Sequence, residues 1–177
     1  MKKRLLLLAF TLTVFTSFSQ DWKRFKSEEF NFIVDFPAVP EESVQKVPTA
    51  VGELDMNMFM LTRETGDNVV YSVISSSYPK EQFINATESY NNSVLDGAVN
   101  GAVKNVNGKL VFDNKVVFNG YPGRSFKISY QGAFLYINAY LVENTMMICQ
   151  VICYEAKDGN EGIKKFFDSF DIIKTKS

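Results

Sequence analysis

Residues 134–142 read FLYINAYLV, and residues 146–154 read MMICQVICY. Both stretches are rich in β-branched and aromatic residues, a composition that favours β-strands. In residues 134–142 the odd positions carry Leu, Ile, Ala and Leu, whereas the even positions carry mainly aromatic residues. Since neither face is polar, both faces must be covered, and we expect this strand to lie in the interior of a sheet.

The rest of the chain predicts more strands and two helices. Apolar residues recur every three or four positions from 79 to 106, which predicts a long helix with Pro79 in its first turn and Gly108 after its end. A second, short helix is expected over residues 160–170, where the apolar residues form one stripe. We expect further strands at residues 22–25, 31–36, 42–49, 52–63, 68–77, 110–118 and 124–130. An antiparallel sheet between helical layers is an α+β fold.

The composition excludes most catalytic chemistry. The 177 residues contain no histidine, so histidine-based nucleophile pairs, histidine-ligated zinc and imidazole pH switches are all impossible. The acidic residues lie mostly beside predicted turns, without the spacing of a calcium loop or a facing pair of carboxylates. We therefore predict no enzyme activity, no catalytic residue, no metal and no cofactor. A hydrolase that uses only acids as its catalytic groups is the alternative.

The first 19 residues predict an export signal. Lys2, Lys3 and Arg4 precede the apolar stretch 5–18, and Ser17-Phe18-Ser19 has small residues at the positions that a signal peptidase reads. A helix over that stretch would rise about 21 Å, short of the roughly 30 Å hydrocarbon core of a bilayer. We expect cleavage after Ser19, a periplasmic or secreted protein with no membrane span after cleavage, and one domain over residues 20–177.

The charge balance argues against nucleic acid as a partner. Removal of residues 1–19 takes the Lys and Arg total from 19 to 16, against 20 Asp and Glu. A nucleic-acid-binding domain would show an excess of basic residues gathered on one face, whereas here the lysines are spread among acids. We expect an unknown envelope or extracellular protein as the partner instead.

The two cysteines are expected to be free and buried. Cys149 and Cys153 lie four residues apart in one predicted strand, a separation of about 13 Å, whereas a disulfide needs Cα atoms within about 7 Å. The period of a strand places both on the same face as Val151. They are best interpreted as small buried hydrophobic residues.

Three motifs resemble one family of bacterial domains. They are Phe36-Pro37-Ala38-Val39-Pro40, Gly120-Tyr121-Pro122-Gly123-Arg124 and Lys165-Phe166-Phe167-Asp168-Ser169-Phe170. In order and spacing the chain resembles the secreted PsbP-like domains, which are similar in fold to an extrinsic photosystem II subunit, a Ran-binding nuclear import factor and the periplasmic DcrB-like proteins. The resemblance implies an α-β-α sandwich around an antiparallel sheet. It also implies a role in binding or assembly rather than catalysis.

The segment Tyr121-Pro122-Gly123-Arg124 offers the candidate binding residues. Pro and Gly at its centre match a type II turn, in which Gly123 would adopt a positive φ. Tyr121 and Arg124 could contact a partner through an aromatic ring and a fork of donors, although a purely architectural turn is the favoured interpretation.

Two other residue groups have a structural and a functional interpretation. The tyrosines with Gln150 could line a groove for a small molecule or pack in the core: Tyr71, Tyr136, Tyr140 and Tyr154. Gly97 and Gly101 should let the long helix pack closely on the sheet. We therefore predict a domain that binds a protein partner or an envelope component. The alternative is a carrier of a small apolar ligand on an aromatic sheet face beneath the long helix.

Overall fold

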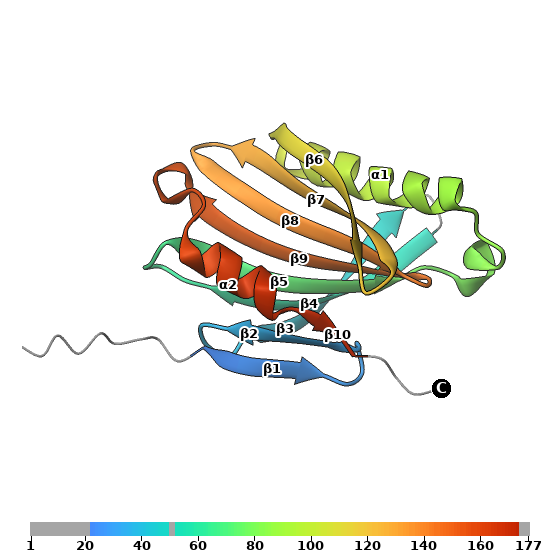
Figure 1. Ribbon diagram of the computed structural model, residues 1–177, viewed down its shortest axis with the longest axis horizontal. Helices are drawn as coiled ribbons and strands as arrows, with labels where there is room; N and C mark the ends of the chain where they lie inside the picture. The colour runs from blue at the N-terminus through green and yellow to red at the C-terminus, as the bar shows by residue number, and fades with distance from the viewer. Residues whose placement is uncertain (1–21, 50–51, 174–177) are drawn as a thin grey trace, which may run out of the picture.

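The computed structural model describes residues 22–49 and 52–173 (Figure 1). The predicted signal peptide therefore lies outside the described residues. The elements, in chain order, are β1 (Lys23–Ser27), β2 (Phe32–Phe36), β3 (Glu41–Thr49), β4 (Gly52–Thr62), β5 (Asn68–Ser77), the 3-10 helix η1 (Lys80–Phe83), α1 (Glu88–Val106), β6 (Lys109–Phe118), β7 (Tyr121–Tyr130), β8 (Ala133–Val142), β9 (Thr145–Tyr154), the 3-10 helix η2 (Glu155–Lys157), α2 (Glu161–Ser169) and β10 (Asp171–Ile172).

The strands form two antiparallel sheets. The large sheet has seven strands in the order β3-β4-β5-β9-β8-β7-β6, and the small sheet has the order β1-β2-β10. The strands predicted at residues 22–25 and 31–36 correspond to β1 and β2, which form a hairpin in the small sheet, where β10 extends it. Figure 1 shows α2 and the small sheet on one face of the large sheet and α1 on the opposite face.

Each face of the large sheet has its own core. On the α1 side, Leu95 and Val99 pack with the odd-numbered residues of β8 and with Phe126 and Ile128 of β7. On the other side, aromatic residues from β2, α2 and β8 surround the cysteines of β9. The two apolar faces of residues 134–142 are thus both covered, as predicted, and β8 lies between β9 and β7. Cys149 and Cys153 are free and buried, also as predicted.

The long helix begins later than the sequence indicates. Pro79 precedes η1, and α1 begins after Thr87, whose Oγ1 accepts a hydrogen bond from the amide of Tyr90 at 3.2 Å. Asn85, with φ 59°, separates the two helices. The apolar spacing misled the prediction because Phe83 does not belong to the helical stripe; its ring packs between those of Tyr78 and Tyr90.

The prediction of a turn at Tyr121-Pro122-Gly123-Arg124 is wrong. All four residues lie in β7, and the chain turns at Asn119 and Gly120, which have φ values of 52° and 88°. Gly123 has no positive φ. A Cβ there would lie 2.6 Å from the Ala139 carbonyl oxygen and 2.7 Å from Cδ1 of Tyr140, so glycine is required by the close approach of β8.

Candidate ligand-binding site

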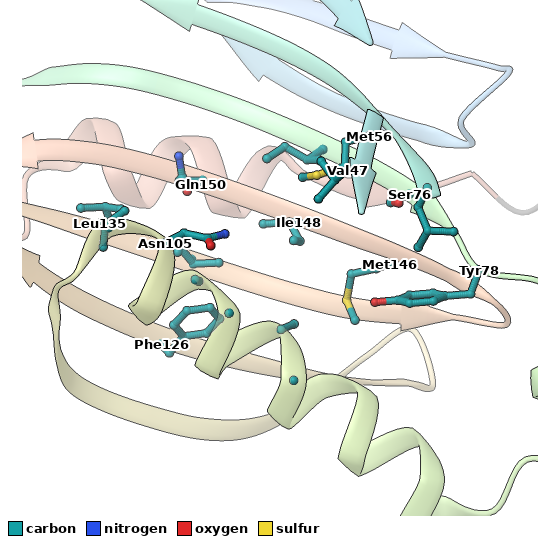
Figure 2. A pocket seen from close by; sticks show the side chains of 18 residues that line it. Val47, Met56, Ser76, Tyr78, Asn105, Phe126, Leu135, Met146, Ile148 and Gln150 are labelled. Atoms are coloured by element: carbon teal, nitrogen blue, oxygen red, sulfur yellow. The ribbon is translucent and has the colours of Figure 1, made fainter. Parts of the chain in front are cut away.

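A cavity of about 330 Å³ lies between α1 and the large sheet (Figure 2). Its floor consists of side chains from β5, β7, β8 and β9, among them Ile74, Ile137 and Ile148. Val47, Leu54 and Met56 of the β3–β4 hairpin form one wall, and α1 forms the other. The volume is at the lower end of the range for small-molecule sites, about 300–1,000 Å³.

The cavity has two causes. The helix α1 covers only part of the large sheet, and the residues of α1 that face the uncovered part are small. The helix packs mainly on β7 and β8. Along the cavity it presents Gly97, Ala98, Gly101 and Ala102. The expectation that the glycines allow close helix-to-sheet packing is wrong, because a Cβ at Gly97 or Gly101 would have nothing within 4 Å. These glycines leave space instead of closing it.

The cavity is mainly apolar and its lining carries no charge. None of its 18 lining residues has an ionisable acid or base side chain apart from Tyr78, and most are aliphatic residues or methionine. Burial, the largest effect, and the nearby Tyr90 raise the pKa of Tyr78, so its phenol stays protonated. In Figure 2, Tyr78 lies beside Met146 at one end of the cavity and Leu135 lies at the other.

A few neutral polar groups interrupt the apolar lining. They are the amides of Asn105 and Gln150 and the hydroxyls of Ser76 and Tyr78. The Ser76 hydroxyl donates to the Asp55 carbonyl oxygen at 3.0 Å, whereas Asn105 comes from the exposed side of α1. Such a lining can bury hydrocarbon and can hydrogen-bond an uncharged head group. It offers no counter-ion for a charged one.

Arg124 fixes α1 beside the cavity. It is only 8% exposed and forms ion pairs with Asp96 of α1 and with Asp113 of β6, the latter at 2.8 Å. Tyr121 lies on the opposite face of β7 and packs against the aromatic core. The structure therefore separates the two residues that the sequence suggested as one contact site, and it places Arg124 where its charge is already neutralised.

The predicted tyrosines are also separated from the cavity. Tyr71 and Tyr140 are buried in the core on the α2 side, and Tyr136 faces that side too. Of that group only Gln150 lines the cavity. The aromatic face of the sheet is thus opposite to the long helix, and the prediction of an aromatic surface beneath α1 is wrong. The sequence analysis did not identify the aliphatic residues that line the cavity, because their pattern in the sequence is that of ordinary core positions.

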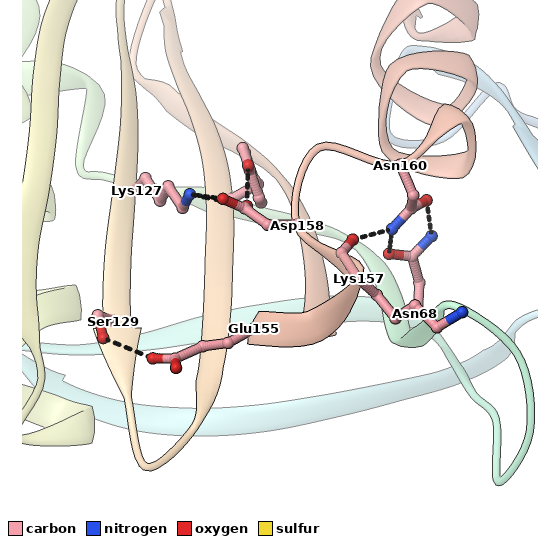
Figure 3. Close-up of polar contacts among 8 residues, drawn as sticks. Asn68, Lys127, Ser129, Glu155, Lys157, Asp158 and Asn160 are labelled. Carbon is pink, nitrogen blue, oxygen red and sulfur yellow. Dashed lines mark hydrogen bonds and ion pairs between the residues drawn. The ribbon is translucent and has the colours of Figure 1, made fainter.

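A polar cluster on the α2 side joins β7, β8 and the loop before α2 (Figure 3). Lys127, which is buried, contacts both carboxylate oxygens of Asp158 at 2.7 and 2.8 Å and lies 3.7 Å from the centre of the Phe134 ring. Tyr136 donates its hydroxyl hydrogen to the same carboxylate. Burial opposes ionisation of Asp158, but the hydrogen bonds from Lys127 and Tyr136 outweigh it and lower its pKa.

The surrounding contacts show what this cluster does. Asn68 and Asn160 exchange two amide hydrogen bonds of 2.8 Å, and Asn160 Oδ1 also accepts from the first amides of α2. Lys157 pairs with Asp67 at 2.9 Å. With both of its lysines in ion pairs, the cluster anchors residues 155–160 to the sheet and positions the start of α2. Its chemistry is structural.

No metal-binding cluster and no membrane-spanning helix is present in the part of the chain that the structure describes. Over residues 22–49 and 52–173, no three His, Cys, Asp or Glu side chains are placed to hold a metal ion. None of the helices in the same ranges is long and apolar enough to cross a membrane. The cavity beneath α1 is therefore the feature of this structure that most resembles a binding site.

Comparison with known proteins identifies the fold. No family model matches the chain, and a search of curated proteins finds no match. Among solved structures, the cyanobacterial PsbP protein (CyanoP) from Synechocystis sp. PCC 6803 matches with a TM-score of 0.52 and 12% identity over 86% of this chain and 93% of that one. A protein of unknown function from Pseudomonas aeruginosa, PA94, matches at a TM-score of 0.42 and 14% identity over 77% of this chain and 85% of that one. The arrangement of antiparallel strands, the helix in mid-sequence and the short C-terminal helix is thus the PsbP-like α+β fold.

Proposed function

We propose that the chain is a non-catalytic binding domain that holds a small, uncharged, mainly aliphatic molecule between α1 and the large sheet. The observation that carries this proposal is the cavity of about 330 Å³ with its uncharged lining. It favours a small molecule over a protein as the primary occupant, since a concave apolar space with a few polar groups is the usual form of a small-molecule site.

The glycines of α1 support the same conclusion. A glycine inside a helix costs about 0.5–1 kcal/mol relative to alanine, so two of them need a reason. In many helices the reason is a close contact, but here a Cβ at Gly97 or Gly101 would meet nothing within 4 Å. Room for a ligand is a reason that fits the geometry. Along α1, the cavity extends from Gly97 to Val106, a rise of about 14 Å.

The absence of catalytic groups around the cavity supports a binding role. The chain has no histidine, and the hydroxyls of Ser76 and Tyr78 are the nucleophilic groups of the lining. Neither has a lining carboxylate or amine that could act as a general base. We also propose that the domain works outside the cytoplasm after removal of residues 1–19, because of the signal-like N-terminus. Intact mass of the exported protein should then correspond to a chain that begins at Gln20.

A homologous series of linear alcohols tests the binding proposal. Each methylene moved from water into the cavity contributes about 0.8 kcal/mol, so affinity should rise roughly fourfold per methylene until the cavity is full. Carboxylates of the same chain lengths should bind more weakly, because the lining provides no cation. Titration calorimetry measures both series, and native mass spectrometry of the freshly purified protein would show a co-purified ligand.

Two leucine substitutions on α1 provide the matched control. Gly101→Leu places a side chain in the cavity and should abolish alcohol binding, while the open space around a Gly101 Cβ lets the fold accept it. Asn100→Leu adds the same side chain at an exposed position outside the lining and should leave binding unchanged. Affinity that does not depend on chain length, or equal binding by both variants, would contradict the proposal.

A further inference from the structure

β6, the edge strand at one end of the large sheet, carries several exposed apolar side chains. β6 pairs with β7 and ends the strand order, and Figure 1 shows it at the margin of the sheet. Val111 and Val117 are 51% and 75% exposed, and Leu110 and Phe112 are exposed as well. An exposed edge strand with unpaired backbone groups is a template for another strand, and proteins usually protect it with charges.

The charges on β6 do not protect it against a second copy of itself. The two charged residues near its middle, Asp113 and Lys115, have opposite signs and flank Asn114. If two copies pair antiparallel about a two-fold axis at Asn114, each Asp113 lies directly opposite the Lys115 of the other copy. Phe112 then lies opposite Val116. Cross-strand pairs of opposite charge and of apolar residues are the pairs that stabilise an antiparallel ladder.

We propose that β6 of one copy pairs with β6 of a second copy in this register, which joins the two large sheets edge to edge. The interface is isologous, so the same residues serve both copies. The register places both α1 helices on one face of the combined sheet, and the bulge between Leu110 and Phe112 ends the regular pairing.

The contacts and exposure of the Asp113 carboxylate allow this pairing. Its Oδ2 accepts from Arg124 at 2.8 Å, whereas its Oδ1 is buried and has no hydrogen-bond partner among the described residues. The Asp113 side chain as a whole is 22% exposed, so the lysine of a second copy would approach its charge from the strand edge without a bond to the buried Oδ1. The other edge of the sheet differs, because β3 begins with the adjacent acids Glu41 and Glu42.

The interface is small, which determines how the dimer should behave. A stable protein interface buries about 1,600 Å² in total, more than one pair of strands provides. We therefore expect a reversible equilibrium between monomer and dimer, with the mass doubling as the protein concentration rises. Sedimentation velocity over a wide concentration range measures it.

Site-specific cross-linking tests the register. In an antiparallel pair the two Cα atoms on the axis are about 4.5–5.5 Å apart, within the 4.4–6.8 Å that a disulfide accepts. Asn114→Cys should therefore form a disulfide between copies under mild oxidation. Val117→Cys lies on the same strand, but its two copies would be roughly 20 Å apart, and it should not cross-link. Cys149 and Cys153 do not interfere, because both are buried.

A charge reversal tests the pairing without a cross-link. Lys115→Glu places two acids opposite each other in each half of the interface, so the variant should stay monomeric at concentrations where the wild type dimerises. Lys46→Glu, a charge reversal on the opposite edge strand, is the matched control and should dimerise normally. A wild type that stays monomeric, a dimer that Lys115→Glu leaves intact, or equal cross-linking at positions 114 and 117 would overturn the proposal.

Discussion

The same substitution, glycine to alanine, should have opposite effects at two positions of this protein. At Gly97, in the interior of α1, a Cβ would meet nothing within 4 Å, so alanine only removes the backbone entropy that glycine loses in a helix. We expect Gly97→Ala to raise the free energy of unfolding by about 0.5–1 kcal/mol. At Gly123 the new Cβ would lie 2.6 Å from the Ala139 carbonyl oxygen and 2.7 Å from the Tyr140 ring.

Those two contacts at Gly123 cannot both be relieved by a side-chain rotation, because one of them is with backbone. β7 and β8 must separate in the interior of the sheet, and overpacking of this kind costs about 1–3 kcal/mol. For a domain of this size, each kcal/mol changes Tm by about 2–4 °C. Gly97→Ala should therefore melt slightly above the wild type, and Gly123→Ala should melt clearly below it.

Chemical unfolding followed by fluorescence measures both changes. The chain has one tryptophan, Trp22, which packs edge-on against Tyr71 with ring centres 5.4 Å apart. It therefore reports on the contact between the N-terminal segment and β5. If the free energy of unfolding falls with denaturant concentration at the same slope in wild type and variants, only stability has changed. A Gly123→Ala protein as stable as the wild type would refute the packing argument, and a destabilised Gly97→Ala protein would refute the claim that the space beside α1 is open.

Three further predictions concern buried or paired groups. A thiol reagent should label neither Cys149 nor Cys153 in the native protein and both after denaturation, because both are buried and burial raises the pKa of both thiols. Rapid labelling of the native protein would show that β9 is accessible. Burial opposes ionisation of Asp158, but the bonds from Lys127 and Tyr136 outweigh it, so its folded pKa lies below its unfolded pKa. Its stabilising contribution is therefore present above the unfolded pKa and disappears as the pH falls through the folded pKa, and urea titrations should show less acid destabilisation for Asp158→Asn than for wild type. Arg124→Met should lower the free energy of unfolding, measured with urea, by about 3 kcal/mol, the lower end of the cost of removing one partner from a buried ion pair, because the Asp96 side chain is 52% exposed; a loss near zero would mean that the ion pairs contribute nothing.

Local periodicity was sufficient to predict most of the elements. The two apolar faces of residues 134–142 predicted an interior strand, because side chains alternate across a strand whatever lies nearby. The stripe that ends in Phe166 and Phe170 predicted a helix that packs on a sheet, for the same local reason. The composition, with no histidine, also excluded every catalytic site that depends on an imidazole, because no fold can supply a side chain that the chain lacks.

The roles of the individual site residues depend on contacts between segments that are distant in sequence. Gly97 and Gly123 are the same residue type, yet one borders a cavity and the other touches a neighbouring strand, because the space around a glycine depends on segments distant in sequence. Tyr121 and Arg124 are close in sequence but lie on opposite faces of β7. The cavity itself results from the position of α1, which covers only part of the sheet. Local sequence is enough to specify the period and polarity of each element, and the packing of those elements specifies where space, charge and a free strand edge remain.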